Sequence, residues 1–370
     1  MTSFRAPAVR VAAIGAVAHL AFIASMLATH QADPSWFVRF GVDAKQTILG
    51  QKALGSVVVH PGIGADGQFF WILAHDPLLL HPQQIAEWID RPVYRAQRIA
   101  YPALAAPWRL FGERGLLWAL LLENVAVVAI GSYFTARLAS SLGLPPRAAL
   151  GFAFNPGVIF ATMFDLCDAL ALAATVGALY AAVSRKRPAL VLLSALAGLA
   201  KEPAALALAG AALTKGLGRP HNGRPQLEGE ARMLLIIPAV LAIITWGLYI
   251  RSRFDWSPTN VVEFAPPFVG FVNAWRTRWS AGLPVEILWA TGLLIASGAI
   301  VLLFARRRTM LLCAALPYAL LVPFLSHHVL LFTTNALRAF APAFTFLWLE
   351  VYRRGPDREE ALTSEVEPSR

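Results

Sequence analysis

The stretch VRVAAIGAVAHLAFIASMLA covers residues 9–28 and contains a single charged side chain, Arg10. About 20 consecutive apolar residues are what a helix needs to cross the hydrocarbon core of a bilayer. The stretch is longer than the apolar core of a usual signal peptide, and no small-x-small cleavage pattern follows it. We therefore expect residues 9–28 to form a first membrane span that is retained.

Apolar stretches recur along the whole chain, of whose 370 residues 57% are hydrophobic and 15% are charged. A soluble domain could not bury so large an apolar fraction. The apolar segments cover residues 8–29, 115–136, 147–163, 166–183, 188–200, 202–214, 232–250, 284–305, 309–325 and 329–350. Because a helix satisfies its own backbone hydrogen bonds in lipid, we predict an all-α polytopic membrane protein with about ten transmembrane helices.

Lysine and arginine residues indicate the orientation, because they accumulate in short cytoplasmic loops. With ten spans and a cytoplasmic N-terminus, every short basic cluster except the one in residues 251–283 falls on the cytoplasmic side. The pattern favours two short spans over residues 188–214, since one kinked span would reverse all later clusters. Membrane topology thus explains the net charge of +10, and we expect no nucleic-acid partner. The high Ala, Arg and Pro content suits a GC-rich bacterium, so we predict the bacterial inner membrane, with both termini cytoplasmic.

One membrane-embedded domain is predicted over residues 1–350, followed by a charged, disordered cytoplasmic tail over residues 351–370. It has two long extracytoplasmic loops, residues 30–114 and residues 251–283. The first loop is rich in aromatic residues, which predicts short helices lying in the membrane interface. The aromatic residues concerned are Trp36, Phe37, Phe69, Phe70, Trp71, Trp88 and Trp108.

Acidic residues gather at three turns on the predicted outer face. Asp66 lies in the first loop, Asp165 and Asp168 lie between the third and fourth spans, and Lys201 and Glu202 lie between the fifth and sixth. Carboxylates that meet at one membrane surface can form a general base or a cation site.

Basic residues of the first loop and of the last span could bind phosphate groups. The run Tyr94-Arg95-Ala96-Gln97-Arg98 carries two guanidinium groups that suit a phosphate or pyrophosphate group. Arg338 and Glu123 lie within apolar segments, where ionisable groups face a partner or an aqueous cavity. We hypothesise that Arg338 pairs with Glu123 or reaches a lipid phosphate.

Each candidate also fits a plainer role. Asp66 suits the N-cap of the apolar stretch that follows it, and the acidic pair of the second turn suits a capping pair. The Lys201-Glu202 pair suits a solvated break between two helices. Arg95 and Arg98 suit side chains that reach up to lipid headgroups.

The motifs resemble those of the GT-C superfamily, the polytopic glycosyltransferases that use lipid-linked sugars. Residues 66–70 (DGQFF), with 74–77 (AHDP) and 94–102 (YRAQRIAYP), resemble a bacterial GT-C-like group of cell-surface glycopolymer proteins and mannosyltransferases. Residues 165–170 and 199–202 resemble the same group. The chain departs from it with Asp168-Ala169 in place of Glu-Pro and with Lys201 in place of Arg.

The resemblance implies a GT-C-like fold and a transfer reaction on the outer face. The donor would be a polyprenyl-phosphate sugar, and the acceptor a glycan or glycolipid. Asp66 would be the general base, and Arg95, Arg98 or Lys201 would meet the leaving phosphate. Asp165, Asp168 and Glu202 would orient the sugar or acceptor, or hold a divalent cation such as Mg²⁺ or Mn²⁺. The further residues expected to bind substrate are Gln68, Gln97 and Arg338.

Two other functions remain open on the sequence. Polar breaks in short helices and an arginine within the membrane are also features of transporters and flippases. A non-catalytic membrane subunit of an envelope glycan assembly complex would use the outer loops as docking surfaces. Such a subunit would tolerate Asp66→Asn, whereas the enzyme would not.

Overall fold

A computed structural model describes residues 5–214, 229–254, 263–282 and 284–353. These residues are mainly helical, as predicted, with one parallel pair of two-residue strands, β1 (Phe40–Gly41) and β2 (Val59–His60). Four described helical stretches are long and apolar enough to cross a membrane: Ala6–Thr29, Ala100–Ser141, Gly229–Arg253 and Val285–Arg306. The structure is therefore consistent with an all-α membrane protein. The number of spans stays a prediction, as does the orientation.

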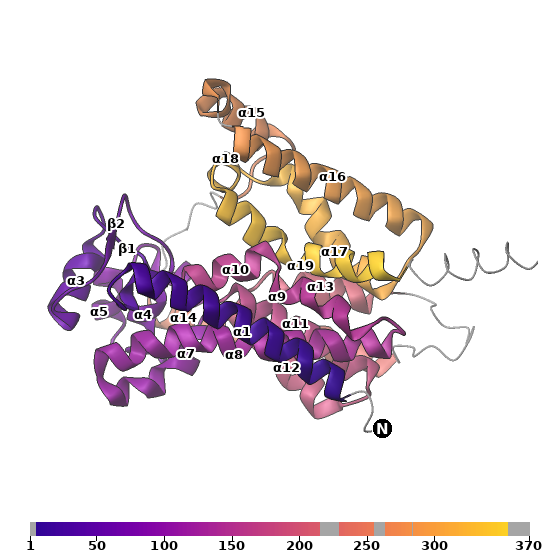
Figure 1. The fold of residues 1–370 in the computed structure, drawn as a ribbon, viewed down its shortest axis with the longest axis horizontal. Helices are drawn as coiled ribbons and strands as arrows, with labels where there is room; N and C mark the ends of the chain where they lie inside the picture. Colours follow the sequence, from indigo (N-terminus) through magenta and orange to yellow (C-terminus); the bar gives the residue numbers. More distant parts are fainter. Residues whose placement is uncertain (1–4, 215–228, 255–262, 283, 354–370) are drawn as a thin grey trace, which may run out of the picture.

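The first apolar segment forms α1 (Arg5–Thr29), which packs along the longer α8 (Gly112–Ser141) (Figure 1). Gly15 permits the close approach, since a Cβ there would lie 3.0 Å from both Ala153 Cβ and Ser132 Oγ. The buried ring of His19 is hydrogen-bonded through Nδ1 to the Thr162 hydroxyl (2.9 Å), and its Nε2 donates to the Ala153 carbonyl (2.8 Å). A polar side chain in the first helix is thus satisfied by partners far along the chain.

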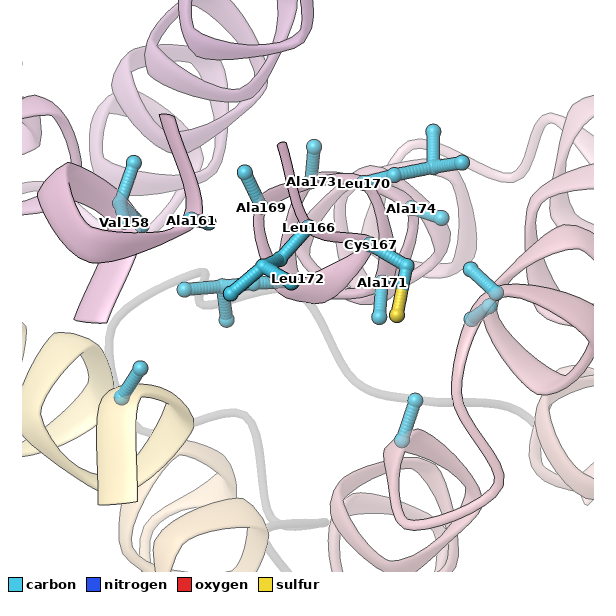
Figure 2. Close-up of a cluster of buried hydrophobic side chains, with 14 of the residues drawn as sticks. Val158, Ala161, Leu166, Cys167, Ala169, Leu170, Ala171, Leu172, Ala173 and Ala174 are labelled. Carbon is cyan, nitrogen blue, oxygen red and sulfur yellow. The ribbon is translucent and has the colours of Figure 1, made fainter. Parts of the chain in front are cut away.

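The centre of the molecule is α11 (Asp168–Val183), whose side chains from Asp168 to Ala182 are all buried. It packs against α8 on one side and α12 (Arg187–Ala200) on the other. Much of the surrounding apolar cluster comes from α11 itself and from the turn before it (Figure 2). The many alanines of α11 let neighbouring helices come close, which is how helices associate where lipid removes the hydrophobic driving force.

Two further segments consist of short helices. Residues 147–163 form η2 (Pro146–Ala149), α9 (Leu150–Ala153) and α10 (Pro156–Met163). Asn155 separates the last two and caps α10 by accepting a hydrogen bond from the Gly157 amide (2.8 Å). Residues 188–214 form two helices, α12 and α13 (Ala204–Ala212), which meet at an extended Lys201. At 1.5 Å per residue, α10 and α13 are much shorter than the ~30 Å of a bilayer core.

The C-terminal helices are α14 (Gly229–Arg253), α15 (Val269–Thr277), η3 (Trp279–Ala281), α16 (Pro284–Arg306), α17 (Met310–Leu321), η4 (Val322–Phe324), α18 (His327–Leu330) and α19 (Thr333–Tyr352). Helix α14 packs on α12, whereas α17 packs on α13, α16 and α19. Helix α19 also packs on α10. Figure 1 shows α15 to α19, in orange and yellow, along one side of the earlier helices. The predicted tail, residues 351–370, lies outside the described residues from 354 onward.

The first loop folds into a body of its own at one end of the molecule (Figure 1). Its helices are α2 (Ser35–Val38), α3 (Lys45–Leu54), α4 (Gly67–Leu73), α5 (Pro82–Trp88), α6 (Pro92–Ala96), α7 (Ala100–Ala105) and η1 (Ala106–Phe111). The prediction of interfacial aromatic residues is wrong for Trp36, Phe37, Phe69, Phe70 and Trp71, which are buried inside the protein. Phe69, Phe70 and Trp71 belong to the main apolar cluster, which includes residues of α8 and α11, whereas Trp36 and Phe37 pack in a second cluster with residues of α1 and α8. In contrast, Trp108 is 54% exposed.

The contact between α13 and α17 provides a test of the packing. A Cβ on Gly210 would lie 2.1 Å from the Cys313 carbonyl oxygen, whereas a Cβ on Gly247 of α14 would meet nothing within 4 Å. We expect Gly210→Ala to destabilise the protein by about 1–3 kcal/mol through overpacking. Gly247→Ala should be neutral or stabilising, by up to ~1 kcal/mol, because alanine is the better helix former.

The measurement is the thermal unfolding midpoint of both variants in detergent, against the wild type. Equal midpoints for Gly210→Ala and Gly247→Ala would show that α13 and α17 do not pack as described.

Candidate functional site

Seven of the predicted site residues meet in one ionic network. It joins four distant parts of the chain: the first loop, the start of α11, the break between α12 and α13, and the first half of α19. Its members are Asp66, Arg95, Arg98, Asp168, Lys201, Glu202 and Arg338. The sequence suggested each of them separately, and the fold brings them together.

Asp66 lies at the N-terminus of α4 with three cations around its carboxylate. Arg95 Nη1 donates to Oδ1 at 2.7 Å, while a terminal nitrogen of Arg98 and one of Arg338 lie 3.9 and 3.8 Å from Oδ2. The carboxylate caps no backbone amide of α4. The plainer interpretation of Asp66 as a helix cap is therefore wrong, and its partners are charged side chains.

These partners determine the protonation of Asp66. Burial alone would raise the pKa of the Asp66 carboxyl, but the charges of Arg95, Arg338 and Arg98 outweigh burial and hold the pKa below its usual range. Asp66 is consequently ionised at neutral pH. A carboxylate held by several cations is a weak base, and an anion that drew these cations away would make it a stronger one.

Asp168, the first residue of α11, is the buried centre of the network. Arg338 donates to its Oδ2 through Nε (3.0 Å) and Nη2 (2.8 Å), and the Lys201 ammonium donates to Oδ1. One carboxylate thus binds α11 to both α19 and the α12–α13 break. The capping role does not fit Asp168, because its side chain faces these cations and α11 has no side-chain cap.

The hypothesised pair between Glu123 and Arg338 is wrong. Arg338 faces Asp168 and Asp66, and it also donates to the Asn335 side chain at 3.3 Å. Both carboxylate oxygens of Glu123 are buried, with no hydrogen-bond partner among the residues that the structure describes. The sequence could not show which acidic residue pairs with Arg338, because the pairing depends on how α19 packs.

Arg95 and Arg98 are held inside the protein rather than reaching up to headgroups. Their side chains are 11% and 9% exposed. Arg95 forks onto Asp90 (2.9 and 3.1 Å) and lies over the Phe69 ring at 4.2 Å. Arg98 donates to the Tyr94 hydroxyl (2.6 Å) and lies 3.7 Å from Glu202.

Three predicted site residues lie outside the ionic network. Gln68 donates to the Ile63 carbonyl (2.8 Å) and so braces the turn before Asp66. Gln97 is half-buried and makes no side-chain hydrogen bond with the described residues. Asp165 is fully buried, and the side chain of Asn124 is its polar neighbour.

Sequence reasoning missed Asp90, the second carboxylate partner of Arg95. A separation of five residues does not by itself predict contact between Asp90 and Arg95. The contact depends on the turn of the chain through α6, which begins at Pro92. It also missed Arg39, whose neighbours come from distant parts of the chain.

The basic groups of the network are of a kind that binds anions. Four cations, Arg95, Arg98, Lys201 and Arg338, meet the carboxylates of Asp66, Asp168 and Glu202, and Asp90 is a fourth carboxylate in contact with Arg95. Guanidinium and ammonium groups gathered in this way bind phosphate. Among the residues that the structure describes, no three His, Cys, Asp or Glu side chains group to hold a metal ion.

Comparison of the whole chain with protein-family models, with curated proteins and with solved structures gives no match. The function is therefore argued from the chemistry of the ionic network.

Removing the central carboxylate tests the network as a structural unit. Asp168→Asn leaves Arg338 and Lys201 without their buried counter-charge, so we expect a loss of about 3–5 kcal/mol in unfolding free energy. Glu230→Gln, which removes the exposed ion pair between Arg187 and Glu230, should cost at most ~1 kcal/mol.

Unfolding of both variants in mixed micelles gives the comparison. Similar small losses would mean that the buried pairs around Asp168 do not hold the helices together.

Proposed function

We propose that this protein is an integral-membrane glycosyltransferase of the inverting GT-C type. It transfers a sugar from a polyprenyl-phosphate donor to a glycan or glycolipid acceptor of the cell envelope, on the outer face of a bacterial inner membrane. The observation that carries the proposal is the ionic network, in which the ionised carboxylate of Asp66 lies among three arginines suited to phosphate. The motifs that resemble the GT-C group supply much of this network.

In the proposed reaction, the acceptor hydroxyl attacks the anomeric carbon and gives its proton to Asp66. The bond between that carbon and the phosphate oxygen breaks, and polyprenyl phosphate leaves as an anion. Arg95, Arg98, Lys201 or Arg338 stabilises the developing negative charge. A single displacement inverts the anomeric centre, unlike the two-step retaining scheme with a carboxylate nucleophile.

The contacts around Asp66 suggest how donor and base are coupled. Arg95 and Arg338 contact the Asp66 carboxylate. A donor phosphate competes for the same cations, and each one it draws away raises the proton affinity of Asp66. The base is therefore strongest when the donor is bound.

The proposed topology has ten spans with both termini in the cytoplasm. Helices α10 to α13 are too short to cross a bilayer upright, and their breaks carry Asp168 and Lys201. Positive-inside counting places these breaks and the first loop on the outer face, where the lipid-linked donor is delivered. In this proposal arginine and lysine neutralise the leaving phosphate, a role that the Mg²⁺ or Mn²⁺ considered from the sequence would also serve.

A transporter or flippase of a lipid-linked or anionic substrate is the second candidate. The paired helix breaks at α10–α11 and α12–α13, joined by Lys201 and Asp168, are what favours it. Discontinuous helices at a charged site are a common feature of transporters. A third candidate, a non-catalytic subunit of a glycan assembly complex, has no specific contact in its favour.

The experiment is an envelope glycan analysis of a deletion strain complemented at matched expression. We expect Asp66→Asn to fail in complementation, because loss of a general base costs about 10²- to 10⁴-fold in rate. Asp43→Asn, an exposed acidic residue of the same loop, should restore the glycan fully.

If Asp66→Asn restores the glycan as well as the wild type does, Asp66 is not the base, and the scaffold candidate comes first. Accumulation of the intact donor in the outer leaflet of the deletion strain supports the transferase. Its confinement to the inner leaflet would instead support the flippase.

A further inference from the structure

Arg39 is a second cationic centre, and no charged partner from the ionic network reaches it. It ends α2 in a left-handed conformation (φ 64°). Its guanidinium carbon lies 4.2 Å from the centre of the Trp36 ring and 4.7 Å from that of Phe164. The charge is therefore held between two aromatic faces, an arrangement that attracts cations and fixes the plane of the guanidinium.

The hydrogen bonds of Arg39 leave one edge of the guanidinium unused. Nη1 donates to His60 Nδ1 at 2.7 Å, so Nδ1 is the acceptor, and His60 Nε2 donates to the Trp36 carbonyl at 3.1 Å. The imidazole is thus the neutral form with its proton on Nε2. Arg39 Nε is buried and has no partner within the described residues. Nη2 has no hydrogen-bond partner among the described residues either and, unlike Nε, is not among the buried atoms, so it is the guanidinium nitrogen that a phosphate oxygen can reach.

No carboxylate in the described chain compensates this charge. Burial lowers the pKa of the Arg39 guanidinium to about 10, with no acidic group opposing the shift. Burial, followed by the charge of Arg39, lowers the pKa of His60 to about 4. Each cation of the ionic network, in contrast, contacts at least one carboxylate. A desolvated cation without a counter-charge is costly, and an anion would remove that cost.

The surroundings of Arg39 are rigid. Its carbonyl accepts a hydrogen bond from the Ala65 amide (3.1 Å). A Cβ on Gly64 would lie 2.1 Å from that carbonyl oxygen, and Gly64 has a φ of +74°. Only glycine fits this position. The turn that carries Asp66 is thereby pressed against Arg39.

The location also fits a phosphate at the membrane surface. Trp36 packs in a small apolar cluster with Ile23 of α1 and Leu121 and Val125 of α8. Helix α1 ends at Thr29, so Arg39 lies close to one end of a candidate span. Lipid phosphate groups lie at the depth where spans end.

We propose that Arg39, His60, Trp36 and Phe164 form an anion site that takes a phosphate group, separate from the ionic network. Nη2 of Arg39 donates to a phosphate oxygen, and the two aromatic rings fix the plane of the guanidinium. The phosphate belongs either to a lipid headgroup or to a free anion. The inference does not rest on the proposed function, since it concerns binding alone.

Calorimetric titration of the purified full chain in a maltoside detergent tests the site in the absence of other phosphate. The probes are lysophosphatidic acid and inorganic phosphate, with monoacylglycerol as the probe that lacks phosphate. We expect Arg39→Gln to weaken phosphate binding roughly 10- to 100-fold, the worth of hydrogen bonds to a charged group. Arg39→Lys should lose part of the affinity, because it keeps the charge but not the planar group that stacks on Trp36 and Phe164.

Two control variants separate this site from others. Lys52→Gln removes an exposed charge of the same loop and should leave binding unchanged. Arg98→Gln removes a cation of the ionic network and should retain the binding event that depends on Arg39. The two proposals can therefore fail independently: binding that depends on Arg39 can be intact even where the glycosyltransferase proposal is wrong.

The outcomes are distinct. Binding of lysophosphatidic acid alone identifies a lipid headgroup, and equal binding of inorganic phosphate identifies a free anion; both support the site. Wild-type affinity in both Arg39 variants overturns it. So does the absence of phosphate binding to the wild type, or a loss seen only in Arg98→Gln. If Arg39→Gln fails to fold, Arg39→Lys decides.

Discussion

The buried carboxylate of Asp168 is the point on which the helices around the site depend. It receives Arg338 from α19 and Lys201 from the α12–α13 break, and it starts the most buried helix of the described chain. Charges in an apolar interior are tolerated only when they are paired with good geometry. Any displacement of α19 or of the break would strand at least one charge, so three separate segments are held in a single arrangement.

In that arrangement the carboxylates of Asp66 and Asp168 differ in exposure and in how closely cations bind them. Asp168 is enclosed and bound by two cations at short range, whereas Asp66 is 24% exposed and has its nearest cation in Arg95. The first is suited to hold the structure, and the second to meet a ligand. Arg338 contacts both carboxylates, so the structural and the ligand-binding parts of the network are coupled.

Helix breaks are what allow charged groups to gather here. The turn before α11 and the extended Lys201 before α13 interrupt apolar segments that would otherwise run on as helices. Lysine, glutamate and proline at residues 201–203 favour this break. Close helix packing then depends on small residues, as at Gly210 against the backbone of α17. The arrangement of short helices therefore depends both on breaks that gather the charged groups and on small residues that allow close packing.

The sequence by itself determined the fold class, the apolar segments and the identity of most network residues. The helical segments follow the apolar stretches closely, because apolar length and polar breaks are properties of the local chain. The motif residues Asp66, Arg95, Asp168 and Lys201 were recognisable for the same reason: each stands out as a charge at the edge of an apolar run.

Only the tertiary structure decided which charges meet. It paired Arg338 with Asp168 rather than Glu123, buried the loop aromatics Trp36 and Trp71, and kept Asp165 out of the ionic network. It also placed Arg39 between rings from α2 and from the turn after α10. The spacing of residues along one chain does not specify how distant helices and loops pack. Pairing, burial and the loss of counter-charges arise from that packing.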